Sequence, residues 1–203
     1  MRVLLVAATE LEIASLRPHL GTNVDVLVTG IGMVATAARC SRALTRERYD
    51  LALNVGVCGS FDRSLPPGTV VHVVADRIAE LGAEDGEAFL TLDELHLPAE
   101  SAFANPAPPP IDALRALSAV SAITVNTVHG NERSIADVVE RFKPQVESME
   151  GAAFMSACLI NGVAFAQVRA VSNLVERRNP AAWRLSGAID SLATTTRRIL
   201  EQA

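Results

Sequence analysis

The chain has 203 residues and a formal net charge of −5, and 49% of its residues are hydrophobic but only 4% aromatic. This length suits one folded domain spanning 1–203 with an aliphatic core. The acidic balance, without any block of basic residues, argues against a nucleic-acid-binding surface and favours a small-molecule partner.

The cysteines and the N-terminus bear on cellular location. Cys40, Cys58 and Cys158 form no CxxC pair and have no metal-ligand spacing, which predicts no metal site and fits a reducing cytoplasm. The apolar run at 1–8 is too short for a membrane span and is not followed by a cleavage site. We expect a cytoplasmic protein with no membrane partner.

Apolar runs of strand length alternate with helical periodicity along most of the chain. In chain order we predict strand 2–8, helix 9–20, strand 25–29, helix 33–48, strands 51–57, 69–75 and 88–92, helix 111–119, strand 122–128, helices 135–142 and 149–160, strand 163–171 and helix 186–202. Uniformly apolar strands indicate a sheet covered on both faces. Because some strands follow one another directly, the predicted fold is α/β, a three-layer α/β/α sandwich with a mixed central sheet.

The stretch 77–110 shows no clear periodicity and ends in the proline-rich segment 105–110. Irregular segments of this length inside a compact domain are usually functional or mobile. We predict a lid or an interface element here.

Turns of small or polar residues follow most of the predicted strands, and ligands of α/β sheets bind at the carboxyl ends of the strands. The turns of interest are 9–12, 30–32, 56–60, 128–131 and 172–173. The turn 30–32 lacks the third glycine of a dinucleotide fingerprint, and no P-loop lysine follows it. The sequence therefore predicts no cofactor.

Glu150 stands at the head of the predicted helix 149–160, whose other residues are uncharged. It could simply cap that helix, where the macrodipole favours a carboxylate by about 0.3 to 1 kcal/mol. A helix this apolar is buried on several sides, however, which would bring Glu150 into the interior or into a pocket. The turns that converge on the same edge of the sheet favour the pocket.

Thr9 and Glu12 have the spacing of a capping box, in which the two residues satisfy each other's backbone donors. The functional alternative is a general base that deprotonates a water at the mouth of the sheet. The residues alone leave both interpretations open.

A set of motifs runs in order along nearly the whole chain: AATELE (7–12), VTGIGMVATA (28–37), NVGVCGS (54–60), VESMEGAAF (146–154) and QVRAVSN (167–173). This set resembles the nucleoside phosphorylase and nucleosidase superfamily, which includes methylthioadenosine/S-adenosylhomocysteine nucleosidases and futalosine hydrolases. Segments 59–85, 125–132 and 172–184 resemble futalosine hydrolases in particular. The resemblance implies a nucleoside phosphorylase-like fold, no cofactor, and a homodimer or higher homo-oligomer.

The matching motifs also imply roles for individual residues. Glu12 would activate the attacking water. Met149 and Glu150 would hold the ribose, with the Glu150 carboxylate accepting hydrogen bonds from its hydroxyls. Cys58 and Gly59 would line the sugar and the base.

Other candidates lie around the base and the 5′ substituent. Val128 would contact the substrate, and Arg133, near where relatives have an aromatic residue, would stack on the purine or else be a solvated arginine. His129 reads as a loop residue rather than a catalytic one. The residues that could pair with a substrate carboxylate, or could equally form a solvated face, are Arg177, Arg178 and Arg184.

Asn173 departs from the superfamily pattern, which usually has an aspartate there that helps to protonate adenine at N7. The amide can donate to O6 or N7 of a 6-oxopurine without repelling the oxygen, but it cannot deliver a proton. A site built for one base edge rejects another because buried polar groups stay unpaired. Asn173 therefore favours hypoxanthine over adenine.

These residues favour a futalosine hydrolase that releases hypoxanthine, an activity that belongs to an alternative menaquinone pathway. Neither glycine-containing turn at 30–37 or 56–60 carries an arginine to hold phosphate, so water is the expected nucleophile. The alternatives are a methylthioadenosine/S-adenosylhomocysteine nucleosidase and a non-catalytic nucleoside-binding sensor. The retention of both Glu12 and Glu150 argues against the sensor.

Overall fold

The computed structural model describes residues 1–203. The strands are β1 (Val3–Ala7), β2 (Val24–Val28), β3 (Leu51–Ser60), β4 (Val70–Ile78), β5 (Gly82–Asp85), β6 (Ala88–Thr91), β7 (Ala102–Ala104), β8 (Ser118–Thr124), β9 (Val146–Ser148) and β10 (Phe165–Leu174). The helices are α1 (Glu10–Ile13), α2 (Met33–Arg46), α3 (Asp112–Arg115), α4 (Glu132–Phe142), α5 (Gly151–Asn161) and α6 (Leu185–Glu201), with short 3-10 helices at Arg17–His19 and Pro180–Ala182.

The central sheet is mixed, as predicted. Its strand order is β10-β4-β8-β9-β3-β1-β2, and β7 is added beside β4. Because β10 also pairs with β3, the strands β3, β9, β8, β4 and β10 close into a ring from which β1 and β2 extend. Register shifts at Val73/Ala75 and Val171/Asn173 bend β4 and β10, and such bends allow a sheet to close.

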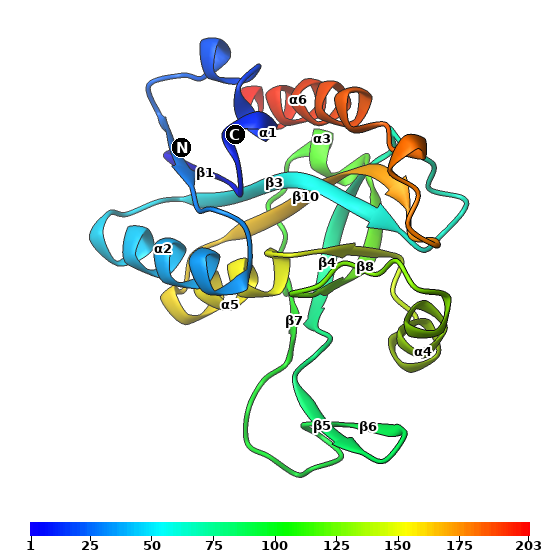
Figure 1. Cartoon of the computed structure of the whole chain (residues 1–203). Coiled ribbons are helices and arrows are strands. Elements are labelled where there is room, and N and C mark those ends of the chain that lie inside the picture. The colour runs from blue at the N-terminus through cyan, green and yellow to red at the C-terminus, as the bar shows by residue number, and fades with distance from the viewer.

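Helices cover both faces of the sheet (Figure 1), which confirms the three-layer prediction. On one face α2 and α5 bury a core that includes Cys40, Phe154 and Met155. On the other face α1, α3 and α6 bury a second core that includes Ile13 and Leu192. No helix combines the length and the apolar character needed to cross a membrane.

Three predicted elements around residues 9–20 and 111–128 were wrong in their bounds, among them the helix 111–119, which is only the turn α3 because Ser118 and Ala119 already belong to β8. The predicted helix 9–20 is only the single turn α1 followed by a 3-10 turn, because Pro18 interrupts the backbone hydrogen bonding of a longer helix. The predicted strand 122–128 is β8, which begins earlier at Ser118 because its small residues pair with β4. Val128 therefore lies beyond the strand, in a loop.

The segment 77–110 is more regular than predicted. It contains the two-stranded hairpin β5–β6, which extends away from the central sheet (Figure 1), and the short strand β7. Neither β5, β7 nor β9 stood out in the sequence, because strands of three or four residues give little periodicity. The role of this segment as a lid or an interface element stays a prediction.

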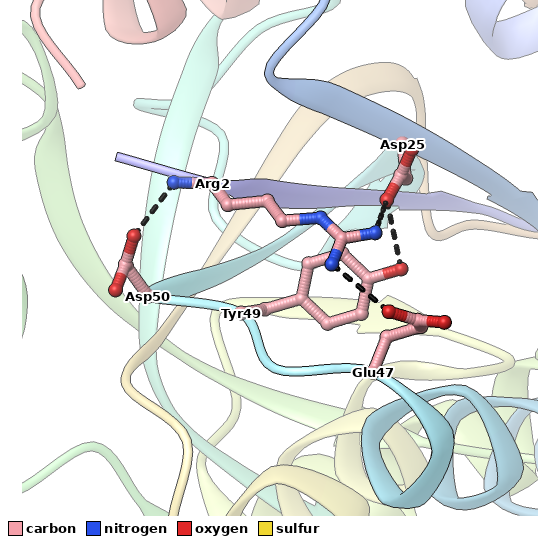
Figure 2. Close-up of polar contacts among 5 residues, drawn as sticks. All are labelled: Arg2, Asp25, Glu47, Tyr49 and Asp50. Atoms are coloured by element: carbon pink, nitrogen blue, oxygen red, sulfur yellow. Dashed lines mark hydrogen bonds and ion pairs between the residues drawn. The ribbon is translucent and has the colours of Figure 1, made fainter.

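A polar cluster, the amino-end cluster, ties together the amino ends of β1, β2 and β3 (Figure 2). The Arg2 guanidinium donates to Asp25 at 2.8 Å and to Glu47 at 3.0 Å, and the Arg2 backbone N–H donates to Asp50 at 2.7 Å. Tyr49 donates its hydroxyl to Asp25 at 3.0 Å and lies under the guanidinium. Each acid in this cluster is thus hydrogen-bonded to Arg2.

Candidate active site

The opposite, carboxyl edge of the sheet gathers the residues predicted to form a site. Contacts join residues at or just after the ends of four strands. Glu12, after β1, accepts from Val57 of β3, and Gly32, after β2, donates to Glu150. Asn173 of β10 lies opposite Gly59 of β3. The short strand β9 leads into Glu150 at the same edge. The sequence-based prediction of where these turns meet is confirmed.

Glu12 is buried, with 7% of its surface exposed. Its Oε2 accepts from the Thr9 backbone N–H at 2.9 Å and from the Thr9 hydroxyl at 3.0 Å, so the predicted capping box is present. Its Oε1 accepts from the Val57 backbone N–H at 3.1 Å, which ties the carboxylate to β3. The capping interpretation is therefore correct, yet one oxygen of this carboxylate is turned toward the strand end.

Glu150 is equally buried, and its side chain makes no hydrogen bond to its own helix. Instead Oε1 accepts from the Gly32 backbone N–H at 2.9 Å, across 118 positions of sequence. Gly32 has φ 99° and ψ 160°, a conformation essentially restricted to glycine. Glu150 is therefore the N-cap residue of α5, as the capping alternative has it, but its carboxylate is directed at the turn after β2 rather than at its own helix.

Neither carboxylate forms an ion pair with a basic side chain. Each is held by neutral donors, and α5 adds the favourable dipole of its N-terminus beside Glu150. The arrangement therefore fixes two carboxylates in place without an ion-pair partner in direct contact. Such a pair can stabilise positive charge that develops on a bound ligand.

Arg169, which belongs to the motif at 167–173 but was given no role from the sequence, lies fully buried beneath this edge with 1% exposed. Its guanidinium donates to the Asn54 side chain at 2.5 Å and to the Gln167 side chain at 3.0 Å. A Cβ at Gly56 would clash with this guanidinium and would lie 2.8 Å from Glu12 Oε1. Only a glycine at position 56 therefore lets Arg169 and Glu12 approach the same backbone.

The network continues from Arg169 through Gln167 to Asp76. Gln167 donates to Asp76 at 2.9 Å, and the Thr124 hydroxyl donates to the same carboxylate at 2.8 Å. Burial raises the pKa of Asp76 to about 6, although its hydrogen bonds and the nearby Arg169 charge act in the opposite direction. Thr124 in turn accepts from the Ala152 backbone N–H at 2.8 Å, which links the network to the helix that begins after Glu150.

Asn173 lies half-buried next to Gly59. Its Oδ1 accepts from the Ser172 hydroxyl at 2.8 Å, which orients the amide so that Nδ2 is the donor, here to the Leu174 carbonyl at 2.9 Å. Cys58 is buried beside them, and burial raises the pKa of its thiol to about 12. A neutral thiol can line a site but is a poor nucleophile.

The remaining predicted residues are less closely tied to this edge. Met149 is half-buried next to Glu150, and Val128 is 38% exposed in the loop after β8. Arg133 has a largely exposed side chain, 3.8 Å from Glu87. No contact in the structure brings Arg133 to Asn173.

Two of the three arginines of the loop after β10 have partners within that loop. The Arg178 guanidinium lies over the Trp183 ring, 5.4 Å from its centroid. Arg184 donates weakly to the carbonyls of Ala181 and Trp183. Arg177 borders an open cavity against α4. A role for any of these in binding a carboxylate stays a prediction.

Comparison with known proteins relates the chain to purine nucleosidases. A family model for the phosphorylase superfamily matches residues 12–203. A futalosine hydrolase of Thermus thermophilus is 32% identical over 187 residues, covering 90% of this chain and 83% of the relative. A 5′-methylthioadenosine/S-adenosylhomocysteine nucleosidase of Colwellia psychrerythraea is 27% identical over 172 residues, covering 79% and 70%.

The fold has solved counterparts as well. The native structure of a futalosine hydrolase from Helicobacter pylori matches with a TM-score of 0.85 and 14% identity, covering 99% of this chain and 97% of that one. At this identity the likeness concerns the fold, including the mixed sheet and its flanking helices.

Proposed function

The chain belongs to the phosphorylase superfamily as a purine nucleosidase, and we propose that its substrate is futalosine, from which it releases hypoxanthine. The proposed products are the free base and dehypoxanthine futalosine, with water as the nucleophile. Support comes from the 32% identity to the Thermus thermophilus futalosine hydrolase and from the residues gathered at the carboxyl edge.

The observation that carries the choice of base is the amide of Asn173. Ser172 donates to Oδ1 and one hydrogen of Nδ2 is donated to the Leu174 carbonyl, which leaves the second Nδ2 hydrogen for an acceptor on the base. A 6-oxopurine offers two acceptors on that edge, O6 and N7, whereas adenine offers a donor and an acceptor. An amide in this orientation suits hypoxanthine.

The sugar side of the proposed reaction depends on Glu12 and Glu150. Cleavage of an N-glycosidic bond passes through an oxocarbenium-like sugar that carries positive charge. Glu12 takes a proton from the attacking water, and Glu150 accepts from the ribose hydroxyls. Because both carboxylates keep their charge unpaired by basic side chains, both stabilise the sugar cation.

A second candidate is a methylthioadenosine/S-adenosylhomocysteine nucleosidase. The 27% identity to the Colwellia psychrerythraea enzyme favours it, and Asn173 counts against it. A nucleoside-binding sensor without turnover would have no use for a water-activating Glu12.

We also propose that the whole chain acts as one domain and that it works as a homodimer or higher homo-oligomer. The β5–β6 hairpin, which projects from the sheet, is the element best placed to contact a second copy.

The test is product analysis by chromatography after incubation with futalosine, methylthioadenosine and inosine, each with and without phosphate. Hypoxanthine from futalosine, at a rate independent of phosphate, is the expected result. Adenine from methylthioadenosine would favour the second candidate, and dependence on phosphate would indicate a phosphorylase. Binding of these nucleosides without any product would support the sensor.

A further inference from the structure

His129 and Glu147 form a close pair beside Gly59, and neither was expected to take part in chemistry. The His129 ring nitrogen Nδ1 lies 2.6 Å from Glu147 Oε2, and the His129 backbone N–H donates to Glu147 Oε1 at 3.1 Å. Glu147 is buried on β9, with 3% exposed. A carboxylate so placed fixes the ring orientation, as in the histidine–carboxylate pairs of hydrolases.

The pair adjoins the corner formed by Gly59 and Asn173. Gly59 is paired with Glu147 across the β3–β9 ladder and with Asn173 across the β3–β10 ladder. A Cβ at Gly59 would lie 3.4 Å from Glu147 Cγ and 3.4 Å from Asn173 Nδ2. The two side chains therefore flank the same backbone position from neighbouring strands.

The second ring nitrogen of His129, Nε2, hydrogen-bonds to no protein group. The ring borders an open cavity of about 470 Å³ between α4 and the β5–β6 hairpin, which neither Asn173 nor Glu150 lines, so the ring is not sealed into the core. The remaining ring contact is with Phe61, edge to face at 6.0 Å. The structure thus holds an imidazole by one nitrogen and leaves the other available.

We propose that His129, held by Glu147, is the catalytic residue that protonates the departing purine. This inference rests on the proposed function and supplies the step that Asn173 cannot perform, since an amide has no proton to give. Asn173 then binds the base through Nδ2, and His129 acts as the general acid. Glu147 is the positioning residue that fixes the ring and offsets its positive charge when both nitrogens carry protons.

The proton balance of the step is complete. The bond between C1′ and N9 breaks, and its electron pair stays on the purine, which receives the Nε2 proton at N7. The oxygen of water bonds to C1′, and Glu12 takes one proton from that water. Exchange with solvent then returns Glu12 and His129 to their starting states, so that the net reaction consumes one water.

The test uses a substrate that needs no proton at N7. Futalosine methylated at N7 already carries a positive charge on the base, so a general acid has nothing to add. For His129→Gln we expect kcat on futalosine to fall by about 10² or more, within the range for loss of a general acid. On N7-methylated futalosine the same variant should stay within about threefold of wild type, because no proton transfer is lost.

A structural role would give a different pattern. If His129 only braced its loop, the variant would lose activity on both substrates alike, and an unchanged kcat on futalosine would likewise overturn the proposal. Glu147→Gln serves as the second variant if His129→Gln does not fold, with the same selective loss expected. His19→Gln, an exposed histidine on the 3-10 turn, is the matched control.

Failure of the proposed function is recognised separately in the wild-type protein. If wild type cleaved methylthioadenosine and not futalosine, the substrate assignment would fail. The His129 comparison would then be made with methylthioadenosine and its N7-methylated form, with the same selective loss expected and an equal loss overturning it.

Discussion

The two ends of the central sheet treat acidic side chains in opposite ways. At the amino end, Asp25, Glu47 and Asp50 are all hydrogen-bonded to Arg2 (Figure 2). At the carboxyl end, Glu12 and Glu150 are held by backbone N–H groups and a threonine hydroxyl, with no basic partner. Asp25 and Glu47 at the amino end therefore pair with a guanidinium, whereas neither acid at the carboxyl end has an ion-pair partner.

This difference separates a stabilising cluster from a functional one. A guanidinium that pairs with carboxylates offsets part of their charge, so that a weaker field remains for a ligand. Neutral dipoles fix a carboxylate in place while its charge stays available. Changes at the carboxyl end should therefore alter activity and specificity, and changes at the amino end should alter stability alone.

The largest effect is expected for Glu12→Gln. The variant loses the charge and the proton acceptor of the proposed base, so hydrolysis should fall by about 10² to 10⁴, measured as kcat. Glu10→Gln is the control, because Glu10 lies on the same helix but is exposed and paired with Arg17. Activity of Glu12→Gln within a few-fold of wild type would show that Glu12 is not the base.

Asp76, buried beneath the carboxyl end, should make stability depend on pH. Its pKa is raised from 3.8 to about 6, so the folded state favours the neutral acid. The contribution of this neutral acid to the free energy of unfolding is complete below about pH 4 and is lost as the pH rises through about 6. A shift of about two pKa units corresponds to a change of about 3 kcal/mol.

Urea unfolding of wild type and Asp76→Asn between pH 4 and pH 7 measures this contribution. The variant has no carboxyl group to titrate at this position. Its free energy of unfolding should therefore rise relative to that of wild type as the pH rises. Asp190→Asn, at an exposed site, should run parallel to wild type. A difference between Asp76→Asn and wild type that stayed constant with pH would contradict the titration.

A smaller change is expected in base specificity. Asn173→Asp restores a group that can accept from the adenine amino group and can donate a proton, so the ratio of adenine to hypoxanthine release should rise about tenfold or more. The measurement is kcat/KM for methylthioadenosine and futalosine. Asn23→Asp at the amino end is the control, and an unchanged ratio in Asn173→Asp would remove the basis for the hypoxanthine assignment.

The smallest effect is expected at the amino end. Arg2→Met removes the exposed ion pairs of the amino-end cluster, so the melting temperature should fall slightly, and less at high salt because surface pairs are screened. kcat should not change. Arg48→Met, exposed and unpaired, is the control. A loss of activity in Arg2→Met at temperatures where it stays folded would break the division between the two ends.

Local sequence patterns predicted the layers and the edge at which the site forms, because both follow from apolar runs and the turns after them. Glu12 and Glu150 stood out as acids at the starts of helices. Their hydrogen-bond partners did not, since Gly32 and Glu150 are 118 positions apart.

The sequence could not predict the buried network either, because its contacts also join residues far apart in the chain. Arg169 reaches Asn54 across 115 positions, and Gln167 reaches Asp76 across 91. The pairing of His129 with Glu147 depends on β9, a strand of three residues that gives no periodic signal. Contacts of this kind become visible only when the strand order is known.

Gly32 would have an unusual profile in a saturation mutagenesis experiment. No atom lies within 4 Å of the position that its Cβ would occupy, so a β-carbon would meet no obstacle there. Its backbone conformation nevertheless disfavours every residue that has one. Alanine and tryptophan should be depleted to the same degree, and the signature of this position would be a penalty that does not depend on side-chain volume.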